Sequence, residues 1–482
     1  MNKGHRVLLH PISAAAAALT LTLACVADAR AQAGPSGGAA PSGSSGSTGG
    51  TSGATGGPSG PTNSPSAPTS SYGGLGGPEG GRLGGPSDPN PYYVGVSQAF
   101  IHDTNVYRIP SGPADTYSVT SLLGGFDQMI GRQHVYGRGV VSGNRYQDEK
   151  GLNNTSYSVY TDIDWDTIEH LSGSINGSFN RSLAAAPTNA GTPVATQNIS
   201  DTQTIEALIR WGGPSLLSLE GGASYSNVGY GSQQYASSEF NQSSVHIGLF
   251  YHGGGPFRVA LGLRGDATRT PQAFVDPATG QVQSTRLTGK HVDLTADYDV
   301  TGQVRADGRL SYTRQQSSIS GQSDFSGWTG SFGLAWQVTG KTLLRADAAR
   351  NAGFNATTYN TFAFTETANG IAFTPVVGVY QNNQLVSSAG ISATWAATAK
   401  ISAFASARYQ RSSQVNVLLA PGTPAADITD ISNVYALGAN YAITRNWGAA
   451  CNLSYERRDV SGGTNYAYDA KTIGCSTQFT WR

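Results

Sequence analysis

The stretch HVDLTADYDVTGQVRADGRLSY, residues 291–312, decides the fold of this chain. Before Thr301-Gly302, Val292 and Leu294 alternate with polar or charged residues, and the alternation resumes after it through Leu310. Successive side chains of a β-strand point to opposite faces, so each half predicts a strand with one apolar and one polar face. Two such runs joined by a short Gly-containing connection predict a β-hairpin.

The same two-residue period recurs from Tyr92 to Trp481, for example over 157–166 and 256–268. Charged residues make up only 12% of the 482 residues, the formal net charge is zero, and glycine contributes 63 residues. This balance lacks the basic surface that nucleic acid requires, so no nucleic-acid partner is expected. After the N-terminus, no run approaches the roughly 20 apolar residues of a membrane helix.

Alternation alone fits either an antiparallel sandwich or a membrane barrel, and three features favour the barrel. The alternating segments match the roughly 9–11 residues with which a tilted strand crosses a bilayer. Aromatic residues also gather near the ends of these segments, where the interfacial girdles of a barrel lie. These aromatic residues are Trp165, Trp211, Tyr251, Trp336, Trp395, Tyr441, Trp447 and Trp481.

A third feature is that connections alternate between short and long. Short ones include 130–132, 212–214, 253–255, 301–302, 339–340 and 444–446, and long ones include 102–114, 183–200, 271–284, 351–384 and 414–426. Outer-membrane barrels have short periplasmic turns and longer external loops. We therefore predict an all-β fold, a transmembrane antiparallel up-and-down β-barrel over 91–482. It has about eighteen strands, or about sixteen if two segments are misread, with both termini periplasmic.

The two ends of the barrel segment must meet, because backbone groups in hydrocarbon all need partners. The strand near 92–101 is therefore expected to pair with the strand near 468–481. That last strand alternates up to Trp481, as in barrels handled by the outer-membrane assembly machinery, which is an expected partner. Arg482 after the aromatic residue departs from that pattern.

The first 90 residues have a different composition. Lys3 and Arg6 precede an apolar run, and Ala31-Gln32-Ala33 offers a small-x-small cleavage site, so 1–33 predicts a signal peptide. Cys25 leaves a lipoprotein as the less favoured alternative. Residues 34–90 are almost wholly Gly, Ser, Pro, Thr and Ala, which predicts a disordered periplasmic segment, either a spacer or a tether.

Two cysteines remain after the predicted cleavage, and Cys451 and Cys475 are equidistant from Gly463 in the last predicted hairpin. They are expected to face one another on adjacent strands, on the lipid side, and to form a disulfide. Free thiols are the alternative, because directly opposed bridges demand restrictive geometry.

The inward face of the strands is expected to line the pore. Its candidates are Arg138, Asp162, Asp164, Arg258, Arg264, Asp293, Asp297, Arg305, Asp307, Arg309, Arg345 and Asp347. Neighbouring opposite charges would pair across strands and leave a hydrated wall of mixed sign, suited to polar solutes that are neutral or weakly charged. The alternative is that these charges only stabilise the lumen.

The long connection after Arg350 is the candidate for an inward-folded constriction or lid. Its aromatic residues would pack into the lumen or stack on sugar rings, and they are Phe354, Tyr359, Phe362, Phe364, Phe373 and Tyr380.

No catalytic arrangement is evident from spacing, and we expect no enzyme activity, cofactor or metal. His102-Asp103 begins an external loop, but adjacent residues on a strand point in different directions. The two late cysteines lack further metal ligands nearby.

The start of the predicted barrel resembles a known family. Residues 91–97 and the run His102-Asp103-Thr104-Asn105-Val106-Tyr107-Arg108 are similar to the opening strand and D-x-N-[LIV]-[FY]-R loop of the EpsL-like β-barrel porins of exopolysaccharide operons. Residues 142–165 are similar to the next segments of that family. The long segment before the barrel is not a usual part of the pattern.

The resemblance implies an outer-membrane pore of a Gram-negative bacterium, associated with exopolysaccharide production or export. Two alternatives are a general diffusion porin for small polar solutes and a structural or surface-interaction barrel with a plugged lumen. The expected partners are outer-membrane lipid, lipopolysaccharide and polysaccharide export components.

Overall fold

The computed structural model describes residues 91–167, 170–183, 197–212, 215–232, 239–253, 255–275, 282–301, 303–318, 324–353, 359–367, 370–378, 384–417, 426–461 and 467–481. The predicted signal peptide and the predicted disordered segment lie outside these residues. Among the residues described, no helix is long and apolar enough to cross a membrane.

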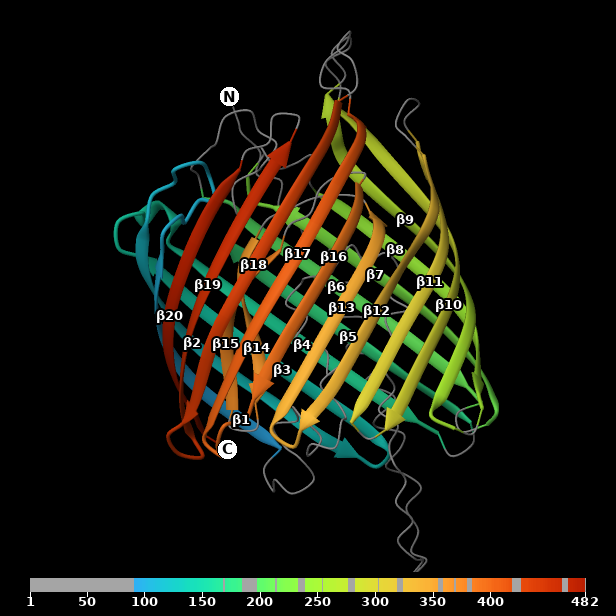
Figure 1. Ribbon diagram of the computed structural model, residues 1–482, viewed down its shortest axis with the longest axis horizontal. Helices are drawn as coiled ribbons and strands as arrows, with labels where there is room; N and C mark the ends of the chain where they lie inside the picture. The colour runs from blue at the N-terminus through green and yellow to red at the C-terminus, as the bar shows by residue number, and fades with distance from the viewer. Residues whose placement is uncertain are drawn as a thin grey trace, which may run out of the picture. The chain divides into compact units, whose positions relative to one another are not determined.

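Within the described residues, eighteen strands form one antiparallel sheet that closes on itself (Figure 1). The strands are β1 (Tyr92–Asp103), β2 (Asp115–Ile130), β3 (Gln133–Tyr146), β4 (Asn154–Asp166), β5 (Leu171–Leu183), β6 (Ile199–Trp211), β7 (Leu217–Tyr230), β8 (Phe240–His252), β9 (Phe257–Val275), β10 (Val282–Thr301), β11 (Val304–Ser317), β12 (Phe325–Thr339), β13 (Thr342–Gly353), β16 (Gln384–Trp395), β17 (Ile401–Val417), β18 (Ala426–Ala442), β19 (Trp447–Ser461) and β20 (Tyr468–Trp481). The predicted all-β barrel of eighteen strands is confirmed.

Each strand pairs with its neighbours in the chain, and the barrel closes where β1 pairs with β20. Val94 lies opposite Trp481 and Asp103 opposite Thr472, so the first strand begins at the barrel end where the last strand finishes. The short turns lie at this same end, which we call the short-turn end; the opposite end is the long-loop end. Gly131, at φ +65°, occupies the tight β2–β3 turn.

Two smaller elements interrupt the up-and-down order. A short 3₁₀ helix, η2 (Lys150–Leu152), lies between β3 and β4. Between β13 and β16, β14 (Tyr359–Thr367) and β15 (Gly370–Gly378) pair only with each other, so β13 pairs directly with β16. The connection predicted over 271–284 is shorter than expected, because β9 extends to Val275 and β10 starts at Val282.

The alternation separates an apolar outer face from a polar inner face. On β9 the outward Leu261 and Leu263 are about 60% exposed, whereas the inward Arg264 is 5% exposed. Small residues let neighbouring side chains lie flat on the wall. The Trp165 ring, for example, lies over Gly173, where a Cβ would approach it to 2.5 Å. An apolar outer face around a polar inner face is the reverse of a soluble protein and is typical of a lipid-facing barrel.

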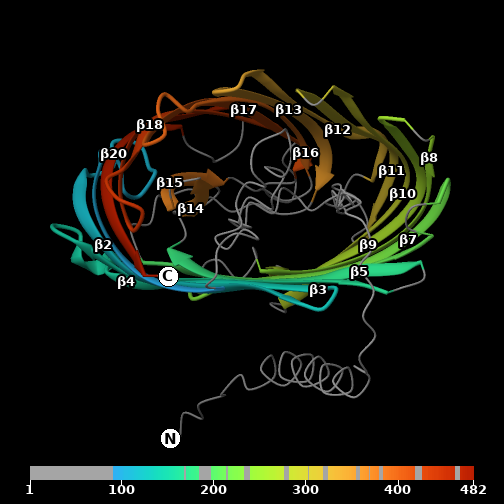
Figure 2. The same ribbon diagram turned by 90° about the horizontal axis from the view of Figure 1, so that it is seen from below.

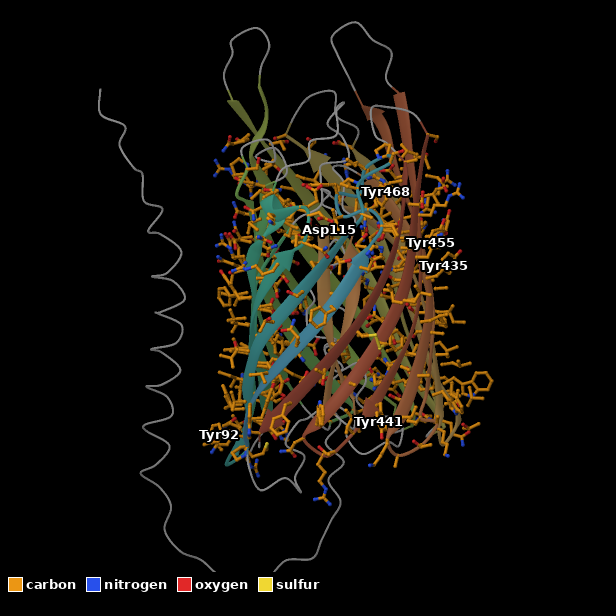
Figure 3. The ribbon with its side chains drawn as sticks, turned by 90° about the vertical axis from the view of Figure 1, so that its left-hand side faces the viewer. Tyr92, Asp115, Tyr435, Tyr441, Tyr455 and Tyr468 are labelled. Atoms are coloured by element: carbon orange, nitrogen blue, oxygen red, sulfur yellow. A yellow bond between two sulfur atoms is a disulfide. The ribbon has the colours of Figure 1, made fainter. Side chains whose placement is uncertain are left out.

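Exposed aromatic side chains form two rings around the outer face. The first ring lies at the short-turn end and contains Tyr92, Trp211, Tyr251, Phe257, Tyr298, Trp336, Trp395, Tyr441, Trp447 and Trp481. The second contains Phe100, Tyr157, Tyr225, Tyr312, Trp328, Tyr409 and Tyr435. Tyr92 and Tyr441 lie near one end of the barrel, and Tyr435 lies toward the other (Figure 3). About eight tilted residues separate the rings, or roughly 20 Å along the barrel axis, close to the apolar band of an outer-membrane barrel.

Candidate functional site: the inner wall

The twelve charged residues expected to line the pore all occupy inward positions of the barrel strands. Arg138, Asp162 and Asp164 lie on β3 and β4, and the other nine lie on β9, β10, β11 and β13. The guanidinium of Arg138 lies over the Tyr160 ring, 5.6 Å from its centroid. The structure therefore gathers most of the candidates on one stretch of wall, from β9 to β13, which we call the charged wall.

Two arginines of the charged wall are ion-paired across neighbouring strands. Arg258 reaches Asp297 at 2.7 Å. Arg264 donates two hydrogen bonds to Asp293, from Nε to Oδ2 at 2.8 Å and from Nη2 to Oδ1 at 3.1 Å. Two-pronged pairing of this kind holds both side chains in one orientation. These charges therefore stabilise the wall as well as lining it.

Next to this pair, a chain of polar contacts runs from β9 across β10 and β11 to β12. Asp266 contacts Nε2 of His291, whose Nδ1 lies 2.9 Å from the hydroxyl of Thr313, and Thr313 in turn contacts Thr329 at 2.7 Å. An acid–imidazole–hydroxyl order is the arrangement of a nucleophilic triad. Thr313, however, is only 1% exposed, so its hydroxyl has no room for a substrate. We interpret the chain as wall packing and keep the prediction that the protein is not an enzyme.

A different part of the charged wall faces solvent. Asp297, Asp307, Gly333, Asp347 and Gly390 lie in one register row, each directly opposite the next, on five successive strands. Asp307 and Asp347 point inward and are nevertheless exposed. We call Asp307 and Asp347 the acidic pair.

Two glycines explain how the acidic pair sits on the wall. A Cβ on Gly333 would lie 2.6 Å from Oδ1 of Asp307, and one on Gly390 would lie 2.5 Å from Oδ1 of Asp347. Each carboxylate therefore covers the bare backbone of the neighbouring strand instead of projecting toward the barrel axis. Arg408 follows Gly390 in the same row and is also exposed.

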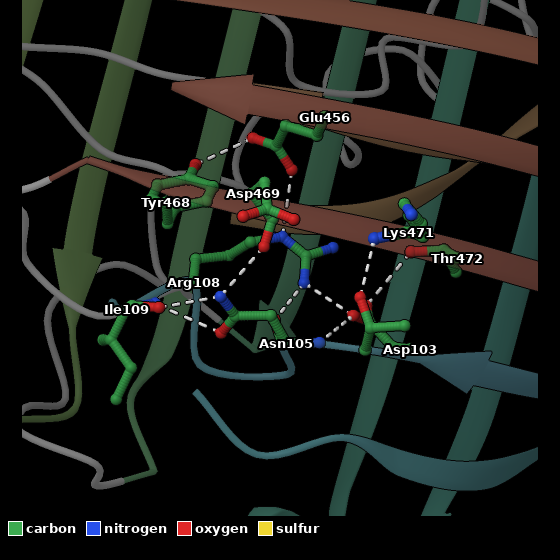
Figure 4. A network of polar contacts seen from close by, with 10 residues as sticks. Asp103, Asn105, Arg108, Ile109, Glu456, Tyr468, Asp469, Lys471 and Thr472 are labelled. Atoms are coloured by element: carbon green, nitrogen blue, oxygen red, sulfur yellow. Dashed lines mark hydrogen bonds and ion pairs between the residues drawn. The ribbon is translucent and has the colours of Figure 1, made fainter. Parts of the chain in front are cut away.

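The opposite stretch of wall, where β1 meets β20, carries a second cluster. Arg108 donates to Asp103 at 2.9 Å and to Glu456 at 2.9 Å (Figure 4). Tyr468 donates to the other oxygen of Glu456 at 2.8 Å, and Thr472 donates to Asp103 at 3.2 Å. The side chains of the three charged residues are 4% exposed or less. We call these five residues the seam clamp.

Local geometry of the 104–114 loop aims Arg108 inward. Arg108 and Ser111 adopt left-handed φ angles of 56° and 54°. The Asn105 side chain donates to the carbonyls of Ile109 and of Asp469 on β20, and so holds the loop against the seam. A left-handed residue that is not glycine marks a conformation imposed by its surroundings.

Burial shapes the ionisation of this loop. Burial alone would lower the pKa of the Arg108 guanidinium, but Asp103 and Glu456 outweigh it and raise that pKa above the ordinary range. Burial, assisted by a 2.9 Å hydrogen bond to Glu149, raises the pKa of Tyr107 to about 12. Arg108 therefore stays charged and Tyr107 stays neutral at any physiological pH.

The seam clamp is the part of the site that sequence reasoning missed. Asp103, Asn105 and Arg108 belong to the D-x-N-[LIV]-[FY]-R motif, but nothing in the motif indicates partners almost 350 residues away; Arg108 and Glu456 are separated by 348 positions. The spacing of three polar residues at the start of the predicted external loop was the available signal. Asp430 and Arg458, paired at 2.6 Å on β18 and β19, were also missed.

Cys451 and Cys475 lie directly opposite one another on β19 and β20 and are joined by a disulfide. Both are exposed on the outward face. The covalent link therefore lies next to the seam, on the opposite face of the wall from the seam clamp.

The long connection after Arg350 places a hairpin inside the barrel. The views along and across the barrel show β14 and β15 within the ring of strands (Figure 2). The hairpin approaches β5 on one side and β19 and β20 on the other. Tyr359, Phe362 and Phe364 lie on β14 and Phe373 on β15, whereas Phe354 and Tyr380 lie outside the described residues.

Among the described residues, no three His, Cys, Asp or Glu side chains are placed to hold a metal ion. Neither a protein-family model nor a curated protein matches this chain. The structure is similar to solved outer-membrane barrels, though distantly. OccK1 (OpdK) of Pseudomonas aeruginosa is 9% identical over 81% of this chain and 99% of its own, with a TM-score of 0.41. OccAB3 of Acinetobacter baumannii is 11% identical over 81% and 98%, at 0.40, and the siderophore receptor PirA of Acinetobacter baumannii is 7% identical over 81% and 81%, at 0.40.

Proposed function

We propose that this protein is a pore of the Gram-negative outer membrane, with both termini of the chain in the periplasm. The supporting observation is that Asp307 and Asp347 point into a closed barrel and are exposed to solvent. An inner wall that binds water offers a path for polar solutes, while the apolar outer face and its two aromatic rings suit a bilayer.

Single-channel recording in planar bilayers tests the pore. The protein without residues 1–33 is expected to give steady conductance. In the variant Asp347→Cys, a charged thiol reagent is expected to reduce that conductance, because the new side chain points inward. The outward variant Leu261→Cys is the matched control and is expected to keep its conductance, since its side chain lies on the lipid side. A sealed barrel would refute the pore, whereas equal block of both variants would refute only the inward position of Asp347.

We further propose that the pore serves the production or export of an exopolysaccharide, on the basis of the resemblance of its first strand and loop. The motif residues Asp103, Asn105 and Arg108 are engaged in the seam, so the motif supports the architecture of the family and not a cargo contact. Recognition of sugars is assigned to the hairpin β14–β15, whose segment is rich in aromatic residues.

A deletion strain tests this second step. Loss of the protein is expected to reduce secreted polysaccharide, and complementation with a chain lacking 359–378 is expected to restore the barrel but not normal export. Normal secretion in the deletion strain, together with ordinary conductance for small solutes, would instead identify a general diffusion porin. Normal secretion with no conductance would identify a structural barrel.

A further inference from the structure

Basic side chains gather on the outward face just beyond the second aromatic ring. On most of these strands the basic residue lies about ten residues from the short-turn end, which is one membrane crossing. The exposed outward residues are Arg145, Arg181, Arg269, Arg286, Lys290, Arg314, Arg350, Arg411, Arg457 and Lys471. They therefore lie at the long-loop boundary of the apolar band.

Four of these cations form a cluster on three adjacent strands, β9, β10 and β11. Arg269 lies directly opposite Arg286, and Lys290 lies directly opposite Arg314. We call these four residues the basic patch. Like charges directly opposite on neighbouring strands destabilise a sheet. Because β10 takes part in two such pairs, we infer that an anion relieves the repulsion when the protein is in its membrane.

Two of the six other outward cations on the same boundary have carboxylate partners. Arg457 pairs with Asp459 at 3.0 Å, and Arg181 lies 3.7 Å from Asp201. Among the described residues, no carboxylate forms an ion pair with a member of the basic patch, and the nearest acid along β9, Asp266, points inward to His291. The patch thus differs from the rest of the boundary in charge density, because its cations lie directly opposite one another in pairs.

The side of the patch toward the membrane is aromatic. Tyr312 is the next outward residue before Arg314 on β11, and its ring packs edge-on against Trp328 with centroids 5.4 Å apart. Trp328 is 61% exposed. Tyr and Trp suit the zone between acyl chains and headgroups, because each has an apolar body and a polar edge. An anion bound here would therefore be attached to a lipid.

We propose that the basic patch binds the phosphate groups of a phosphorylated glycolipid of the outer leaflet. Arginine binds phosphate through paired N–H donors, and lysine adds a point charge. The two cationic pairs lie about 13 Å apart along β10, so a lipid with phosphates at both ends of a sugar headgroup can reach both. The inference rests on the proposed outer-membrane location and orientation, because only then does the long-loop boundary meet that leaflet.

Thermal unfolding in a neutral detergent tests the proposal, with bisphosphorylated lipid A and its dephosphorylated form as probes. The unaltered protein is expected to unfold at a higher temperature with the phosphorylated probe only. In the variant R269Q/R286Q/K290Q/R314Q, the apparent affinity is expected to fall by about tenfold or more, since several charge-assisted hydrogen bonds are lost. Without lipid, this variant is expected to be at least as stable as the parent, because the repulsion is gone.

A matched control removes the same number of charges at the same boundary, in R350Q/R411Q/R457Q/K471Q. It is expected to retain most of the phosphate-dependent shift. Equal losses in the two variants would overturn the patch, as would a shift that does not depend on phosphate. Conductance of the same preparations separates the two proposals: a conducting barrel without a phosphate-dependent shift overturns the patch alone, and a sealed barrel that keeps the shift overturns the pore alone.

Discussion

The seam and the charged wall are built from the same alternating strands, yet they use charge in opposite ways. At the seam, Asp103 and Glu456 share one arginine, and all three side chains are buried. On the charged wall, Arg264 and Asp293 are buried as a pair, but Asp307 and Asp347 remain exposed. The charges at the seam hold the first and last strands together, whereas two carboxylates of the charged wall remain exposed to solvent.

The surroundings of the two regions explain the difference. The loop over 104–114 covers the seam, and its Val106 and Tyr107 form a small apolar cluster with Leu152 of η2. Tyr117 and Tyr146 stack nearby with centroids 4.6 Å apart. On the charged wall, the row through Asp307 and Asp347 contains glycines, which have no side chains to bury the neighbouring carboxylates. The loop therefore turns the inner face of the seam into a packed core, whereas the glycines leave this row of the charged wall exposed to solvent.

The largest effect should come from breaking the seam. Arg108→Met leaves Asp103 and Glu456 buried without their cation, which should destabilise the barrel by about 3–5 kcal/mol. The measurement is urea unfolding of the refolded barrel in detergent, followed by tryptophan fluorescence. Arg457→Met is the control, because its ion pair with Asp459 is exposed and should contribute little. Similar midpoints for Arg108→Met and the unaltered barrel would show that the seam does not depend on the clamp.

The disulfide beside the seam should have the next largest effect. Replacing Cys451 and Cys475 by serine frees a hairpin whose ends are 24 residues apart, for which chain entropy predicts a loss of up to about 3.5 kcal/mol. The same unfolding experiment with reductant should lower the stability of the unaltered protein and leave the serine variant unchanged. If reductant lowers both equally, the loss does not come from this bond.

The barrel itself was predictable because its determinants are local. A two-residue period, segment length and alternating connection lengths gave eighteen strands, and the pairing of β1 with β20 followed from the need to satisfy every backbone group. The hairpin β14–β15 was not predicted as strands, because its segment was interpreted as one long connection. The inner faces were also predictable, since parity assigns Arg264 and Asp293 to one side.

The roles within the inner faces were not predictable, because they depend on contacts between distant parts of the chain. Alternation places Asp103 and Asp307 on the same kind of face, yet one is buried in a clamp and the other is exposed. The sequence gives no reason to expect Glu456 beside Arg108. Nor does parity reveal that Arg269 and Arg286 are opposed, because that depends on the register of the β9–β10 hairpin.

A smaller effect should distinguish packing from charge at the seam. Tyr107→Phe keeps the ring in the apolar cluster but loses the hydrogen bond to Glu149, at a cost of about 1 kcal/mol near neutral pH. Because folding raises the pKa of Tyr107 to about 12 from 10.0, the phenol stabilises the fold fully below pH 10. That contribution should disappear as the pH rises from 10 to 12.

Urea unfolding at several pH values measures this difference. The stability gap between the unaltered protein and Tyr107→Phe should be constant up to pH 10 and should shrink above it. A gap that stays constant through pH 12 would mean that the phenol does not ionise differently in the folded and unfolded states.

The smallest effect, in free energy, should come from the charged wall, and it should appear in transport and not in stability. In Asp307→Asn with Asp347→Asn, two exposed carboxylates become neutral without a change of shape, so the unfolding midpoint should stay the same. The preference for cations over anions should fall on the order of threefold at 0.1 M salt, which corresponds to less than about 1 kcal/mol. Reversal potentials in a potassium chloride gradient measure this preference.

At 1 M salt the difference between the double variant and the unaltered protein should nearly vanish, because the screening length falls from about 10 Å to about 3 Å. Asp469→Asn removes an exposed outward carboxylate and should leave the reversal potential unchanged. If the double variant matches this control at low salt, the acidic pair does not face the permeation path, and the two regions differ in packing alone.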